Sequence, residues 1–298
     1  MRRTSILIRT RLPRRELFRH CLVFGLFLIE SLPTTTAMAD GLVFELPPDG
    51  TWCEYSGETN SEVSIELPEN IASTLSGEAK KQLDKMSGLH RHQGTIRLSS
   101  VGSEIRAQRP CRWVEISRTA TMLEPEIEKP PSGEASKHQV LKLLIPERYL
   151  VRGEDPLANA ILTLWNPKDV DVKNVELDKG FDRIQYEIDR FRQVFPPTLN
   201  SKETLPSATI KTPVGEFRDC EVISGTSHFD RPLLGDSRWE FESEWELALH
   251  ADAPYGLVRI QCKSTGKEVT RNIVTHVKMQ YVHILSKAGE GATSTLQD

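Results

Sequence analysis

Four glutamates alternate along one stretch of the chain and are the first candidates for chemistry. Glu240, Glu242, Glu244 and Glu246 share one parity of residues 239–249, so they would point to the same side of a strand. Paired carboxylates serve glycoside hydrolysis, and clustered oxygens bind calcium. However, glycosidase pairs come from convergent elements, and a calcium site needs a loop that wraps around the ion. The pattern therefore favours a solvated outer face that also discourages unwanted sheet pairing.

The eight histidines do not form a catalytic or metal-binding pattern. His90 and His92 have the spacing of a strand or loop, without a nearby carboxylate to complete a zinc site. His276 and His283 fall on opposite parities of one predicted strand, so their side chains do not converge. The sequence motifs of serine hydrolases, cysteine nucleophiles and nucleotide-binding loops do not occur. We therefore expect no cofactor, no metal and no enzymatic activity, with a hydrolase as the less favoured alternative.

Four cysteines follow the N-terminal segment, and each lies in or beside a strand-like run. An exported protein meets an oxidising compartment, in which disulfides form. Four cysteines allow three pairings, among which sequence alone does not choose. We favour Cys53–Cys111 and Cys220–Cys262, because each pair would join segments within one half of the chain. Free buried thiols are the alternative, and the lack of C-x-x-C spacing argues against zinc.

The first 39 residues have the composition of an export signal. They contain seven arginines, and an apolar run at 21–29 that is too short to span a bilayer as a mature helix. Residues 37–39, Ala-Met-Ala, offer the small-x-small pattern of a signal-peptidase site. We predict cleavage near Ala39 and a periplasmic or extracellular protein, with an uncleaved membrane anchor as the alternative. The Arg14-Arg15 pair leaves the choice between the general and twin-arginine routes open.

Removing this leader makes the chain more acidic. The whole sequence has 38 basic and 42 acidic residues, and the leader holds 7 and 2 of them, so 31 and 40 remain. A nucleic-acid-binding protein normally carries a basic patch, which the sequence lacks. Net negative charge also argues against attraction to an anionic membrane face, and no later apolar run is long enough for a transmembrane helix.

The segment from Trp239 to Ile260 organises the rest of the chain. Its apolar residues share the parity opposite to the glutamates, and a turn at 253–256 returns the chain into a second apolar strand. Eleven alternating residues span about 36 Å, about twice an ordinary strand, and such strands favour a coiled sheet. An apolar concave face would suit a ligand. Its candidate lining consists of Trp239, Phe241, Trp245, Leu247, Val258 and Ile260.

Periodicity predicts three helices between the strands, at 71–86, 155–166 and 181–195. We expect a mainly β (α+β) fold in which a strongly curved antiparallel sheet or half-barrel carries two or three helices on its concave face. One domain at 40–285 follows the signal peptide at 1–39. It contains a loop insert at 122–136 and precedes a disordered tail at 286–298.

Several short motifs lie between Thr212 and Ile260: Thr212-Pro213-Val214-Gly215-Glu216-Phe217, Cys220-Glu221-Val222, the strand around Trp245, and the return Ala253–Arg259. Together they resemble the LolA/LolB-like class of exported bacterial proteins. The resemblance implies an incomplete, curved antiparallel barrel with helices on its concave side, in a class whose best-known members carry lipoproteins or lipid. This chain departs from them in length, in its four cysteines and in its acidic strand face. No lipid-handling residue can be matched position by position.

These observations favour an exported, non-catalytic protein that holds a hydrophobic ligand, a lipid or a lipidated protein, in a curved sheet. The same apolar face would form an ordinary core if the predicted helices covered it completely. The alternative function is therefore that of a structural or envelope-assembly protein, which acts through a protein partner and binds no small ligand.

Overall fold

The computed structural model describes residues 45–124, 136–152, 154, 156, 159–165, 199–232, 237–270 and 273–296. The predicted signal peptide and the predicted helix at 181–195 lie outside these ranges. In the part of the chain that is described, no helix is both long enough and apolar enough to cross a membrane.

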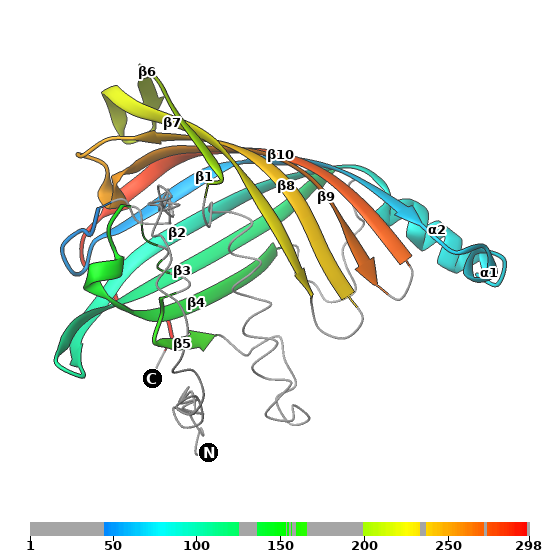
Figure 1. Ribbon diagram of the computed structural model, residues 1–298, viewed down its shortest axis with the longest axis horizontal. Coiled ribbons are helices and arrows are strands. Elements are labelled where there is room, and N and C mark those ends of the chain that lie inside the picture. Colours follow the sequence, from blue (N-terminus) through cyan, green and yellow to red (C-terminus); the bar gives the residue numbers. More distant parts are fainter. Residues whose placement is uncertain are drawn as a thin grey trace, which may run out of the picture.

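Ten strands account for most of the described chain (Figure 1). They are β1 (Trp52–Glu66), β2 (Gly88–Arg106), β3 (Arg109–Glu124), β4 (Ser136–Pro146), β5 (Leu162–Trp165), β6 (Ser201–Thr212), β7 (Gly215–Pro232), β8 (Ser237–Leu249), β9 (Leu257–Thr270) and β10 (Ile273–Gly289). The described helices are α1 (Glu69–Ala72), α2 (Gly77–Met86) and the short 3-10 turns η1 (Glu147–Tyr149) and η4 (Pro254–Gly256).

All ten strands form one sheet in the order β5-β4-β3-β2-β1-β10-β9-β8-β7-β6. Each half of the chain is an antiparallel meander, and the first strand pairs with the last to join the two halves. The described strands do not close into a barrel, because β5 and β6 remain at opposite edges. The prediction of a mainly β fold built on one antiparallel sheet is therefore confirmed. A half-barrel with helices on its concave face stays a prediction.

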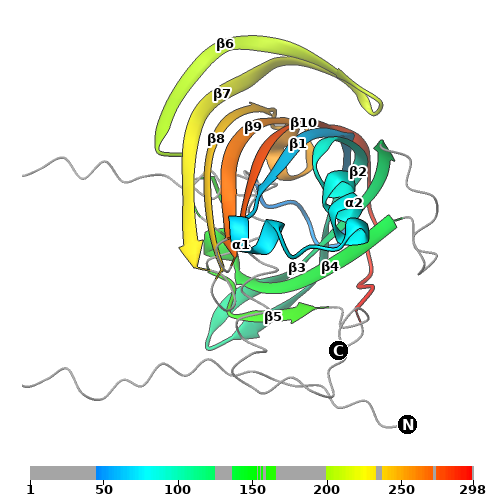
Figure 2. The ribbon, with the colours of Figure 1, turned by 90° about the vertical axis from the view of Figure 1, so that its right-hand side faces the viewer.

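The hydrophobic core identifies one face of the sheet, which we call the inner face. Tyr55 lies opposite Ile96 on β2 and Leu285 on β10, and all three are at most 1% exposed. Directly opposed residues lie on the same face, so this register assigns every strand position to the inner face or to the outer face. Figure 2 shows the strands arranged around an interior, with β7–β9 on one side and β3–β4 below.

The predicted helix at 71–86 is two helices. Ser73–Ser76 interrupt it, and the hydroxyl of Ser76 accepts a hydrogen bond from the Ala79 amide at 3.2 Å to cap α2. Both helices lie at one end of the sheet, beyond β1 and β2 (Figure 1).

The predicted helix at 155–166 is wrong for its C-terminal part. Residues 162–165 form β5 and pair with Leu141–Leu144 of β4. Pairing with β4 gives the backbone groups along this sheet edge hydrogen-bond partners. This gain outweighs the helical spacing of the apolar residues.

Neither predicted disulfide forms, because all four cysteines are free and buried. Cys53 lies opposite Leu98, which lies opposite Ile116, five residues from Cys111. Two strand spacings plus that offset give roughly 20 Å, whereas disulfide-bonded Cα atoms are less than about 7 Å apart. Cys220 and Cys262 are separated in the same way, by β8 and by an offset of five residues.

The disordered tail predicted from Ser286 onward is also wrong for residues 286–296. Strand β10 continues to Gly289, and residues that follow it reach Glu115 on the outer face of β3. The carboxylate of Glu115, which is 4% exposed, accepts hydrogen bonds from the Ser294 hydroxyl (3.0 Å), the Thr295 amide (3.0 Å) and the Thr295 hydroxyl (2.7 Å). The tail thus covers a carboxylate that strand alternation alone would have left on the surface.

We expect Thr295→Ala to lower the free energy of unfolding by about 1–2 kcal/mol, since it removes a hydrogen bond to a buried charge. Urea denaturation measures the change. Thr293→Ala is the matched control: Thr293 is exposed like Thr295 but is not among the described residues that hydrogen-bond Glu115, so its substitution should change stability by less than about 0.5 kcal/mol. Equal, small effects of both substitutions would show that the tail does not hold Glu115 in solution.

Candidate functional site

The six predicted lining residues all lie on the inner face. Leu247 lies opposite Ile260, and Trp245 lies opposite Cys262, which continues the apolar row across β8 and β9. The described sheet therefore brings the six residues together, as parity predicted. Five are buried, with exposures of 6% or less, and Phe241 is half-buried. Whether they contact a ligand stays a prediction.

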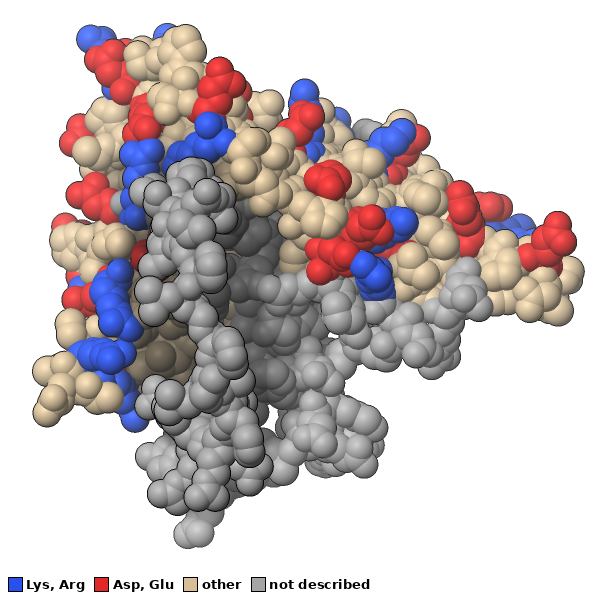
Figure 3. All heavy atoms as spheres, viewed as in Figure 1, with Lys and Arg blue, Asp and Glu red and all other residues tan. Residues whose placement is uncertain are grey.

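The glutamates of β8 project from the outer face. Glu240 pairs with Lys267 at 3.0 Å, and Glu242 contacts His228 at 2.6 Å. Glu246 pairs with Arg259. Each partner is a cross-strand neighbour on the outer face, so these carboxylates pair with histidine, lysine and arginine side chains across the sheet. Figure 3 shows acidic and basic side chains interleaved over the sheet.

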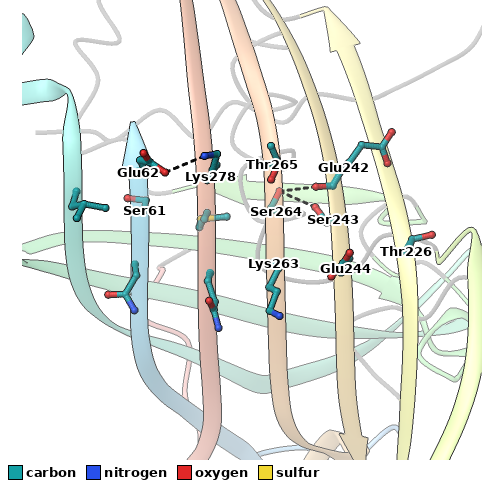
Figure 4. A pocket seen from close by; sticks show the side chains of 14 residues that line it. Ser61, Glu62, Thr226, Glu242, Ser243, Glu244, Lys263, Ser264, Thr265 and Lys278 are labelled. Carbon is teal, nitrogen blue, oxygen red and sulfur yellow. Dashed lines mark hydrogen bonds and ion pairs between the residues drawn. The ribbon is translucent and has the colours of Figure 1, made fainter. Parts of the chain in front are cut away.

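A shallow hollow of about 570 Å³ crosses the outer face of β1, β10, β9 and β8. In Figure 4 its charged side chains come from β1, β10, β9 and β8, and Glu62 reaches Lys278 at 3.2 Å. Its open, charged surface is suited to water and ions. It offers no apolar enclosure for a hydrophobic ligand.

A band of polar side chains crosses the inner face beside the apolar row. The indole Nε1 of Trp245 donates to the Ser227 hydroxyl at 2.8 Å, and the Ser243 hydroxyl donates to Ser264 at 2.9 Å. Cys262 and Tyr281 are hydrogen-bonded to each other, and burial raises the pKa of Cys262 to about 12. This thiol is therefore protonated at neutral pH and unreactive as a nucleophile.

His283 occupies the centre of this inner face and is 5% exposed. It lies opposite Gly57 on β1 and Ile260 on β9, and its ring is 5.3 Å from the Tyr281 ring. Burial, with a smaller contribution from the positive charge of Arg118, lowers its pKa to about 4. The imidazole is thus neutral at physiological pH.

Two more histidines lie further along the inner face of β2. The Nε2 atom of His90 is 3.0 Å from the Met86 carbonyl, and the rings of His90 and His92 are stacked 6.5 Å apart. Burial, then the charges of His90 and Arg118, lower the pKa of His92. Within the described ranges, no three histidine, cysteine or carboxylate side chains are arranged to hold a metal ion.

The surroundings of His283 could not be predicted from the sequence. Parity correctly separated it from His276, but it could not show that Gly57 and Gly94 lie beneath the ring. Their juxtaposition depends on the pairing of β10, β1 and β2, which are distant in sequence.

The chain matches no protein-family model and no curated protein. Among solved structures, it aligns with an inferred lipoprotein from Parabacteroides distasonis at 13% identity and a TM-score of 0.28, over 84% of this chain and 100% of that one. It also aligns with an inferred exported protein of YmcC-like fold from Bacteroides fragilis at 8% identity and a TM-score of 0.28, over 83% and 99%. Likenesses at this level carry no argument about this chain.

Proposed function

We propose that this is an exported, non-catalytic protein that holds a hydrophobic, lipid-like ligand or a lipidated protein against the inner face of its sheet. The export signal at 1–39 and the resemblance of Thr212–Ile260 to LolA/LolB-like carriers belong to this proposal. So does the bending of the sheet into a half-barrel with a concave binding face.

The observation that carries the proposal is the uneven covering of the inner face. At one end of the strands, Leu247, Ile260 and Leu285 are completely buried. Towards the other end the same face continues with Phe241, Val63 and Val277, which are only half-buried. A sheet whose apolar face extends beyond its own core leaves contact area for an apolar ligand.

A matched pair of valine substitutions tests this assignment. Val63→Glu places a charge on the half-buried inner face, and Val282→Glu places it on the outer face of the neighbouring strand, where Val282 is 37% exposed. We expect Val63→Glu to weaken the binding of a fluorescent fatty acid at least tenfold, because a charge in an apolar contact is costly. Val282→Glu should leave binding unchanged, and similar losses in both variants would contradict the assignment.

Native mass spectrometry of the protein purified from an exported fraction provides a separate test. Excess mass that disappears on solvent extraction would support a carried lipid-like ligand. A bare mass, together with no uptake of the fluorescent fatty acid, would overturn the proposal. It would favour the alternative of a protein partner, for which β6 offers an edge strand with mostly exposed side chains.

A further inference from the structure

The side chain of His283 is buried, and it makes no hydrogen bond within the described part of the chain. Neither Nδ1 nor Nε2 has a hydrogen-bond partner among the described residues, although the residue is only 5% exposed. A buried polar atom that lacks a partner costs about 1–3 kcal/mol. Such an atom in a folded protein requires an explanation, and a bound ligand is one.

Two glycines provide the space that the ring occupies. A Cβ atom on Gly57 would lie 2.5 Å from Cδ2 of His283, and one on Gly94 would lie 3.8 Å from its Nε2. Gly57 and Gly94 face each other on β1 and β2, so they form a flat floor beneath the imidazole. The two glycines leave room for the ring on the inner face. An apolar side chain would fill the same space without placing two nitrogens there that lack partners among the described residues.

Arg118 supplies a positive charge on the same face, three strands away from His283. Arg118 lies opposite Ile96, which places it on the inner face of β3, and its charge acts on His283. An imidazole nitrogen and a guanidinium together are donors that suit a carboxylate or a phosphate. The half-buried apolar strip of Phe241, Val63 and Val277 lies three rows further along the same face, about 20 Å from His283.

We propose that the ligand of the inner face is amphipathic, with an acidic head group bound between His283 and Arg118 and a hydrocarbon chain that runs from there towards Val63, Val277 and Phe241. This inference rests on the proposed function and adds the chemical class of the ligand. The carboxylate of a fatty acid and the phosphate of a phospholipid share the required chemistry.

The experiment compares ligands that have the same chain and different head groups. Isothermal titration calorimetry of the full chain would use sodium dodecanoate, dodecyl phosphate and the neutral dodecan-1-ol. We expect at least one of the acids to bind about tenfold or more tightly than the alcohol, because hydrogen bonds to charged groups contribute more than neutral ones. The acid that binds more tightly shows whether the head group is a carboxylate or a phosphate.

His283→Phe keeps an aromatic ring on the glycine floor and removes both nitrogens. In this variant the preference for acid over alcohol should fall to less than about threefold, while binding of the alcohol remains. His228→Phe makes the same change on the outer face and should keep the full preference. Arg118→Gln is the second variant, and it tests the same preference if His283→Phe does not fold.

The outcomes separate the two proposals. Equal affinity of the wild-type protein for acids and alcohol would overturn the head-group assignment and leave the hydrophobic site intact. A preference for the acid that survives both His283→Phe and Arg118→Gln would place the head group elsewhere and would also overturn it. Failure of all three compounds to bind would overturn the proposed function itself, and the head-group assignment with it.

Discussion

Gly57→Ala is expected to lower the free energy of unfolding by about 3 kcal/mol or more. The added Cβ would lie 1.8 Å from the carbonyl oxygen of Val282 and 2.5 Å from the ring of His283. Overpacking a core usually costs about 1–3 kcal/mol, and more where backbone must move. Here the obstructing atom belongs to the backbone of β10, so rotating a side chain cannot relieve the clash. The clash would therefore disturb the pairing of β1 with β10, which joins the two halves of the chain.

Urea denaturation followed by tryptophan fluorescence would measure this loss. Gly77→Ala is the control, because no atom lies within 4 Å of a Cβ built at this position, at the start of α2. Alanine is a better helix former than glycine, so the control should be neutral or slightly stabilising. A Gly57→Ala protein as stable as the wild type would contradict the spacing of β1 and β10 described above.

Strict alternation made the central hairpin predictable. The apolar and acidic parities of 239–249 place Trp245 and Leu247 on the inner face and Glu240 and Glu242 on the outer face, as the strand register confirms. Side-chain alternation is a local property of a strand, so it can be read without knowing which strand lies beside it.

Features that depend on pairing could not be predicted in this way. The cysteines were paired by closeness in sequence, but antiparallel neighbours place Cys53 two strands away from Cys111. The hydrogen bonds that the buried Glu115 carboxylate accepts similarly come from Ser294 and Thr295, which are about 180 residues further along the chain. Composition correctly marks the tail as polar, and it does not reveal the carboxylate that binds it.

For His283, one property could be predicted and another could not. Its parity on β10 follows from the sequence, whereas its position over Gly57 and Gly94 depends on the register of three strands. The same burial that left its nitrogens unpaired also makes the histidine sensitive to acid. This sensitivity gives a prediction that does not depend on any ligand.

Stability should decline as the pH falls from about 6.5 to about 4. The ordinary pKa of histidine, 6.5, applies to the unfolded chain, and burial lowers the pKa of His283 to about 4 in the folded protein. Between these values the unfolded state binds more protons than the folded state, so the free energy of unfolding falls with decreasing pH. The loss from His283 is complete below pH 4 and amounts to about 3 kcal/mol.

Denaturant titrations at pH 8 and pH 4 would measure this loss, with His283→Phe as the reference protein. Other groups near the ring also titrate or carry charge, notably His92, Arg118 and Tyr281, so the difference between the two proteins isolates the contribution of His283. The loss between pH 8 and pH 4 should be about 3 kcal/mol smaller in His283→Phe than in the wild type. Parallel curves for the two proteins would mean that the ring is hydrated in solution. An anion bound at the ring would favour its protonated form, so saturating dodecyl phosphate, which is still ionised at pH 4, should reduce the wild-type loss and leave that of the variant unchanged.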